Sequence, residues 1–392
     1  MMRNALCMLV VVTLALTATA RAQFFAGSFG GGDIEPPVSS SDIGRMATIL
    51  NLSATQREAV EDFQQALLAQ YNRARERMQK IEDGLEQEIE RDRDFNVLNE
   101  FFDVTESFER YIDRLHDAFN DDVQLLLTDD QMMQWPAYER YLRRARAFED
   151  NSELLAGQHV DLIELVRDLE LSEEVRTDVD GALLRYELDL DRLLADHEEQ
   201  RKEQEREMRD KFTQMDNFFA MMPYFQEQVN IARKRELKMR ALTESFASRI
   251  RASLPEGQSD EFEQDFNVRA WPEVYKENYV TSSFDTVLDF EDLTSDQRGS
   301  IMEIRQRYEQ RLAEANRAWV KALRESDEQL KGIFDFFGGK DAALDKAQKS
   351  RDAIDKQTFE ELRGLLTDTQ AARLPGQEDD IDWRAMGNFD GW

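Results

Sequence analysis

The chain has 392 residues and a formal net charge of −31, from 81 acidic and 50 basic side chains. So acidic a protein is unsuited to nucleic acid, whose phosphates are bound by basic surfaces. The chain also contains 24 Phe, 9 Tyr and 5 Trp, which is too many aromatic residues for a disordered acidic protein. The composition therefore favours a folded, non-nucleic-acid-binding protein.

Residues 1–22 have the pattern of a secretory signal peptide. Arg3 precedes an apolar run, and Ala20-Arg21-Ala22 is a small-residue cleavage site. No later stretch approaches the roughly 20 apolar residues of a membrane-spanning helix, so we expect no membrane insertion after cleavage. The only cysteine, Cys7, lies inside the signal, so the mature chain would hold no disulfide. These features predict an exported protein, periplasmic or secreted.

The mature chain divides by composition into a linker, a long helical part and a tail. Residues 23–40 are rich in Gly, Pro and Ser and are predicted to form a flexible linker. Three internal repeats follow, over residues 41–145, 158–275 and 280–375. Residues 376–392 form an acidic tail.

The pattern Leu-Ser/Thr-x-x-Gln opens and closes the repeats. Ser or Thr can cap a helix, Gln three residues later can complete a capping box, and Leu stands at the position of a hydrophobic staple. Degraded copies begin at Leu171 and Leu254, where Val175 replaces Gln and Pro255 replaces the capping residue. Within the repeats the paired copies are 75, 83 and 73 residues apart. The four complete copies are Leu52, Ser53 and Gln56; Leu127, Thr128 and Gln131; Leu293, Thr294 and Gln297; and Leu366, Thr367 and Gln370.

Between the paired motifs the hydrophobic period is helical. Apolar residues recur at spacings of three, four and seven, which places them along one stripe of a helix. So narrow a stripe needs a partner helix, so each repeat is predicted to be a long antiparallel helical hairpin with coiled-coil-like packing. The predicted fold class is all-α. In the first repeat the stripe consists of Val60, Phe63, Leu67, Ala74, Met78, Ile81, Leu85 and Ile89.

A pair of phenylalanines marks the expected tip of each hairpin. One interpretation is that these residues fill the turns. The other is that they form exposed aromatic patches that contact client proteins. Residues 198–206 contain no apolar side chain and are predicted to continue a helix as a solvated arm held by i,i+4 charge pairs. The candidate client-contact residues are Phe101, Phe102, Phe218, Phe219, Phe336 and Phe337.

Residue patterns typical of catalysis are scarce. The sequence has no phosphate-binding loop, no dinucleotide fingerprint and no Gly-x-Ser-x-Gly motif. The three histidines, His116, His159 and His197, fall on different segments and lack the spacing of metal ligands. We therefore expect no enzyme, no cofactor and no specific metal site, although the charge leaves an acidic divalent-metal buffer as an alternative.

At its four complete motifs the chain resembles the LTxxQ family of envelope-stress proteins, the Spy/CpxP-like family. The resemblance implies small all-helical periplasmic proteins with two motif copies per unit, dimeric helical cradles, and activity as ATP-independent chaperones or stress-signalling modulators. Three such units in tandem would account for nearly the whole mature chain. It also implies protein partners, either unfolded clients or an envelope protein, and a homodimer as one arrangement.

Three hypotheses of function follow. The first is an exported chaperone-like binding protein, or an envelope-stress modulator, which would suppress aggregation of a client. The second is a structural coiled-coil scaffold of the cell envelope, which would bind one stoichiometric partner. The third is the acidic metal buffer, which calorimetric titration with Ca²⁺ and Zn²⁺ would test.

Overall fold

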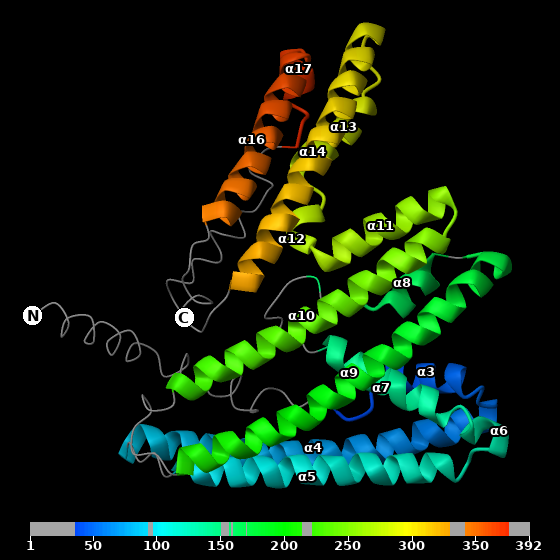
Figure 1. Ribbon diagram of the computed structural model, residues 1–392, viewed down its shortest axis with the longest axis vertical. Helices are drawn as coiled ribbons and strands as arrows, with labels where there is room; N and C mark the ends of the chain where they lie inside the picture. Colours follow the sequence, from blue (N-terminus) through cyan, green and yellow to red (C-terminus); the bar gives the residue numbers. More distant parts are fainter. Residues whose placement is uncertain are drawn as a thin grey trace, which may run out of the picture. The chain divides into compact units, whose positions relative to one another are not determined.

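The computed structural model describes residues 36–92, 97–149, 157, 160–169, 171–213, 222–329 and 342–375. All regular elements in these ranges are helices, with no strand among them, which confirms the predicted all-α class (Figure 1). None of the helices described is long and apolar enough to cross a membrane. The helices form two compact units: the first comprises the described residues within 36–145 and 198–213, and the second comprises those within 146–197 and 222–375.

We group the described helices into three series along the chain. The first series consists of α3 (Ser40–Ile49), α4 (Ala54–Asp92), α5 (Val97–Gln124), α6 (Asp129–Met132) and α7 (Trp135–Glu149). The second consists of α8 (Leu162–Asp168), α9 (Glu173–Thr213), α10 (Met222–Ser253), α11 (Glu256–Ala270) and α12 (Pro272–Tyr275). The third consists of α13 (Tyr279–Leu288), α14 (Ser295–Gln329), α16 (Ala342–Gly364) and α17 (Asp368–Ala371).

In the first unit α4 and α5 pack against each other, and α3 packs on α4. One apolar cluster lies at the motif end of this pair and a second lies further along it. Val38 is completely buried in the first cluster, and its carbonyl accepts a hydrogen bond from Gln64. Ser39 and Asp42 form a capping box at the start of α3. Ordered packing therefore begins within the last residues of the segment predicted to be a linker.

The second unit contains the largest apolar cluster, built from α8 to α12 together with part of α14. The rings of Tyr186 on α9 and Phe246 on α10 lie 5.6 Å apart. The Tyr186 hydroxyl donates a hydrogen bond to the Val160 carbonyl at 3.3 Å. Trp271, between α11 and α12, is only 2% exposed. This core joins a short helix, both long helices and the closing segments of the second series.

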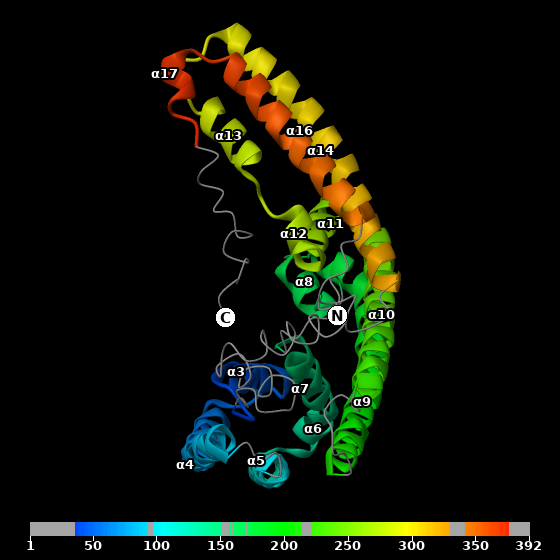
Figure 2. The same cartoon turned by 90° about the vertical axis from the view of Figure 1, so that its left-hand side faces the viewer.

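Helix α14 belongs to two cores of the second unit. Its N-terminal half packs with α13 and α16, which run beside it (Figure 2). Trp319, further along α14, belongs to the large cluster. Arg240 of α10 also forms an ion pair with Asp327 of α14 at 2.5 Å. The second and third helix series are therefore joined through one continuous helix.

The polar stretch at 198–206 is helical and lies within α9. Its side chains are mostly exposed. Lys202 pairs with Glu198 at 3.1 Å one turn away, and Arg206 lies 3.6 Å from Glu203. The prediction of a solvated helical segment is confirmed, and of these two ion pairs the first has the predicted i,i+4 spacing while the second is i,i+3.

Candidate functional site

All four complete motifs form reciprocal capping boxes. In the first copy the Ser53 backbone N–H donates to Gln56 Oε1 at 3.0 Å, and the Gln56 N–H donates to Ser53 Oγ at 3.3 Å. Equivalent pairs of bonds join Thr128 with Gln131, Thr294 with Gln297, and Thr367 with Gln370. Each box satisfies two backbone donors that a helix start would otherwise leave unpaired.

The motif leucines belong to the apolar clusters at the ends of the long helices. A staple would pair each with an apolar residue four positions into its helix. In the copies that open α4 and α14 that residue is Arg57 or Arg298, so a simple staple cannot explain them. Core packing at the motif end is the better account of Leu52, Leu127, Leu293 and Leu366.

The two motif glutamines of the first series also bond to each other. Gln56 Nε2 donates to Gln131 Oε1 at 2.8 Å, and Gln131 Nε2 donates to Gln56 Oε1 at 3.1 Å. Each amide donates a further bond across the pair: Gln56 to the Leu126 carbonyl at 2.8 Å, and Gln131 to the Asn51 carbonyl at 3.1 Å. Both acceptors immediately precede the leucine of the opposite motif. We call this arrangement the first glutamine clasp.

A second glutamine clasp closes the third series. Gln297 Nε2 donates to Gln370 Oε1 at 3.0 Å and to the Leu365 carbonyl at 2.9 Å. Gln370 Nε2 donates to the Asp292 carbonyl at 3.0 Å. The acceptors again precede the opposite motif leucines. Each clasp thus fixes the starts of two helices that are more than 70 residues apart in the chain.

The middle series closes differently. Val175 replaces the first glutamine, so no amide is available there for a clasp. Its N–H reaches Ser172 Oγ at 3.5 Å, and Pro255 at the other copy makes no side-chain cap. Val175 packs instead against the large apolar cluster that contains Trp271. Apolar burial takes the place of the polar clasp.

The side chains of the phenylalanine pairs lie outside the part of the chain that the structure describes. Phe101 and Phe102 belong to α5, but their side chains lie outside what the structure describes. Phe218, Phe219, Phe336 and Phe337 are outside the described residues altogether. Client contact by these residues stays a prediction.

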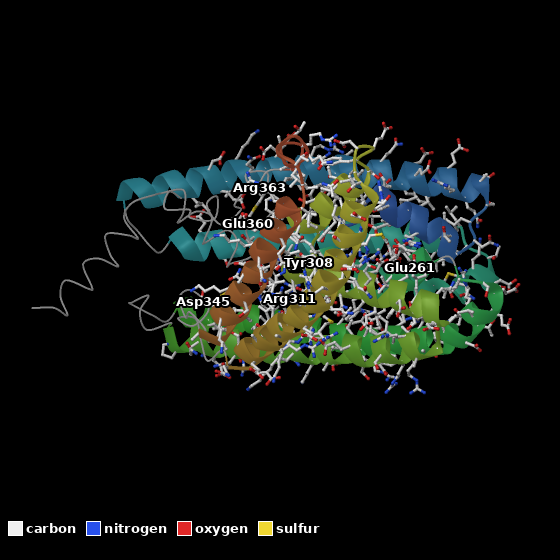
Figure 3. The ribbon with its side chains drawn as sticks, turned by 90° about the horizontal axis from the view of Figure 1, so that it is seen from above. Glu261, Tyr308, Arg311, Asp345, Glu360 and Arg363 are labelled. Atoms are coloured by element: carbon white, nitrogen blue, oxygen red, sulfur yellow. The ribbon has the colours of Figure 1, made fainter. Side chains whose placement is uncertain are left out.

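A buried polar network crosses the third series, where Figure 3 marks Tyr308 on α14 beside α16. Asn278 Nδ2 donates to the Tyr308 hydroxyl at 2.7 Å, and that hydroxyl donates to Asp355 Oδ1 at 2.9 Å. Arg351 pairs with the other oxygen of Asp355 at 3.0 Å. Burial, together with the nearby Asp355 carboxylate, raises the pKa of Tyr308 above its usual range. These groups satisfy one another, as expected of a structural network.

The described histidines lie on different helices. His116 lies on α5 and His197 on α9, while His159 falls outside the described residues. Burial, with help from Arg235 and Lys238, lowers the pKa of His197 to about 4. Within the described ranges no three His, Cys, Asp or Glu side chains are grouped so as to hold a metal ion.

Several large aliphatic side chains are exposed on otherwise well-packed helices. Leu184 on α9 is 54% exposed and Leu188, one turn later, is also exposed. Leu125, Met132 and Met133 are exposed beside the first glutamine clasp. Sequence reasoning did not single out the leucines, because a helical stripe search assigns apolar residues to the core. The useful signal is that Leu184 and Leu188 stand off the stripe of Tyr186 and Leu190, which are fully buried.

Comparison with known proteins gave no match: no family model, no curated protein and no solved structure is significantly similar to this chain.

Proposed function

We propose that this is an exported, non-enzymatic binding protein that holds apolar segments of other proteins without ATP or a cofactor. We further propose that it consists of three tandem helical-hairpin repeats. The recurring order of helices and the placement of motifs at both ends of each series support this architecture. The observation that carries the binding function is the exposure of large aliphatic side chains on helices whose other faces are firmly packed.

Helix α9 provides the clearest example. Tyr186 and Leu190 are fully buried, so the orientation of the helix is fixed and Leu184 and Leu188 remain outside. Burying a leucine side chain is worth roughly 1.5–3 kcal/mol. Leu184 is 54% and Leu188 36% exposed, so covering both would bury about as much new area as one fully exposed leucine, and the helix need not rearrange.

The polar side chains with well-defined geometry are committed to the scaffold. The glutamines form capping boxes and clasps, and Asn278, Tyr308, Asp355 and Arg351 form the buried network. Such use of polar groups supports a binding role rather than catalysis, which requires an activated group beside a substrate site.

Suppression of aggregation tests the proposed function. The mature protein, mixed at equimolar ratio with reduced lactalbumin, should lower the light scattering of the aggregating client. Leu184→Ser with Leu188→Ser should weaken this effect, whereas Arg185→Ser, an exposed change on the same helix, should not. Absence of suppression by the unaltered protein would contradict the proposal.

The phenylalanine pairs form a second arm of this experiment. Replacing Phe101, Phe102, Phe218, Phe219, Phe336 and Phe337 by Ser should reduce suppression if the expected hairpin tips contact clients. Full activity of that variant would confine client contact to other surfaces.

A structural scaffold of the envelope is the second candidate. The solvated stretch of α9 at 198–206 favours it, since a helix without apolar residues there is suited to spanning rather than packing. Recovery of one stoichiometric envelope partner from native extracts would support the scaffold. Recovery of many unrelated clients would support the binding protein.

A further inference from the structure

Three large apolar side chains are exposed close in sequence to the first glutamine clasp. Leu125, which follows α5, is 84% exposed, and Met133, which follows α6, is 70% exposed. Met132, the last residue of α6, is also exposed. The three residues fall within nine consecutive positions of the chain, and no Phe pair is among them. We call them the methionine patch.

The fold does not require large side chains at these positions. Leu125 stands two residues before the motif leucine, and the methionines stand five and six residues after it. The corresponding residues of the second clasp are Gly364, Ala371 and Ala372. That clasp makes the same kind of Gln–Gln and Gln–carbonyl bonds with these small residues. Exposing three large apolar groups is therefore a property of the first clasp only.

Each clasp has an arginine directly after its first glutamine, Arg57 or Arg298, but the segments that close the two clasps differ in charge. Four exposed carboxylates flank the methionine patch in sequence, and no Lys or Arg occurs from residue 115 to 139. The second clasp is balanced instead, since Arg373 pairs with Asp292 at 2.5 Å and lies 3.7 Å from the centre of the Phe290 ring. The four flanking carboxylates are Asp121, Asp122, Asp129 and Asp130.

We propose that the methionine patch docks a basic, apolar segment of a partner polypeptide. This inference rests on the proposed binding function and specifies the chemistry of the client. Methionine and leucine side chains adapt to varied apolar residues. The flanking aspartates attract Lys and Arg on the incoming segment and repel acidic segments. Because the carboxylates are exposed, this charge preference weakens as salt is added.

Fluorescence anisotropy with the full mature chain tests the inference. One labelled peptide alternates Leu with Lys, and a second has Glu in place of each Lys. The Lys peptide should bind and the Glu peptide should not. A triple variant, Leu125→Ala, Met132→Ala and Met133→Ala, should bind the Lys peptide about tenfold more weakly, since each lost contact removes buried apolar area.

Met302→Ala is the matched control, because Met302 is 59% exposed on α14 and lies outside the patch. It should leave the affinity unchanged. A second variant, Asp121→Asn with Asp122→Asn and Asp130→Asn, should weaken binding and flatten its salt dependence while keeping the apolar residues. Far-UV circular dichroism checks that both multiple variants are folded. If the triple variant is unfolded, the charge variant alone tests the inference.

The outcomes separate this inference from the proposed function. Equal binding of both peptides, or an unchanged affinity of the triple variant, would overturn the docking surface even if the protein suppresses aggregation. If the triple variant instead abolished self-association in sedimentation, the occupant would be a second copy of this chain and the inference would be wrong. Specific Lys-peptide binding without any aggregation suppression would uphold the docking surface and contradict the chaperone-like function.

Discussion

The first and middle helix series close their ends by different means. The first uses the polar clasp between Gln56 and Gln131. The middle has Val175 at the equivalent position and relies on the large apolar cluster that contains Trp271. A net hydrogen bond contributes only about 1 kcal/mol, whereas a buried aromatic side chain contributes several. The motif is therefore dispensable where an apolar core already fixes the helix ends.

Loss of the Trp271 side chain should lower stability more than any other change considered. Trp271→Ala should destabilise the second unit by about 3–5 kcal/mol, because it empties a fully packed site. Gly157, in a left-handed conformation with φ of +83°, lies so close that an added Cβ would come within 2.8 Å of the Trp271 ring. Hydrogen exchange of the α10 and α11 amides measures the loss of stability in Trp271→Ala.

Trp135→Ala, a matched change of a buried tryptophan in the first unit, is the control for this experiment. It should leave the exchange of α10 unaltered. If the α10 and α11 amides of Trp271→Ala exchanged as slowly as those of the unaltered protein, the apolar core would not be what holds these helices in place.

Breaking the buried ion pair of the third series should cost somewhat less stability. Asp355→Ala removes the anionic partner of buried Arg351 and leaves it the neutral Asn316, so the buried charge is no longer compensated and the change should cost about 3 kcal/mol. Glu360→Ala, an exposed change on the same helix, should cost less than about 0.5 kcal/mol. Urea denaturation of both variants measures the difference in stability. Equal urea midpoints would show that the buried network does not stabilise the third series.

The middle series should also respond to acid. The pKa of His197 is lowered to about 4 in the folded protein, below its value of 6.5 in an unfolded chain. Between pH 6.5 and 4 the unfolded state therefore binds the proton that the folded state does not, and stability falls as pH falls. Allowing for solvent screening of this half-buried group, the loss should be about 1 kcal/mol.

Comparison of the unaltered protein with His197→Gln isolates this contribution from that of the many carboxylates. The variant should lose less stability between pH 6.5 and 4. Identical pH profiles, or an NMR titration midpoint of His197 near 6.5, would show that burial, with Arg235 and Lys238, does not hold the imidazole neutral.

Sequence reasoning found the all-α class and the helix starts, because capping residues and apolar period are local signals. It explained Gln56 by its own cap alone and so missed the clasp, which depends on two distant helix ends meeting. The middle series offered a hint, since Val175 and the uncapped Pro255 depart from the pattern together. The exposure of Leu125 could not be foreseen, because an apolar residue next to a core position is assigned to the core by pattern.

The coupling between Gln56 and Gln131 distinguishes a clasp from two separate caps. Gln56→Ala and Gln131→Ala each disturb a local cap as well as the clasp, so only the coupling between them isolates the clasp. A double-mutant cycle of thermal unfolding should give a coupling energy of about 1 kcal/mol for this pair. Gln56→Ala combined with Gln370→Ala, from the other clasp, should be additive. Additivity for Gln56 and Gln131 as well would show that the motifs act only as separate caps.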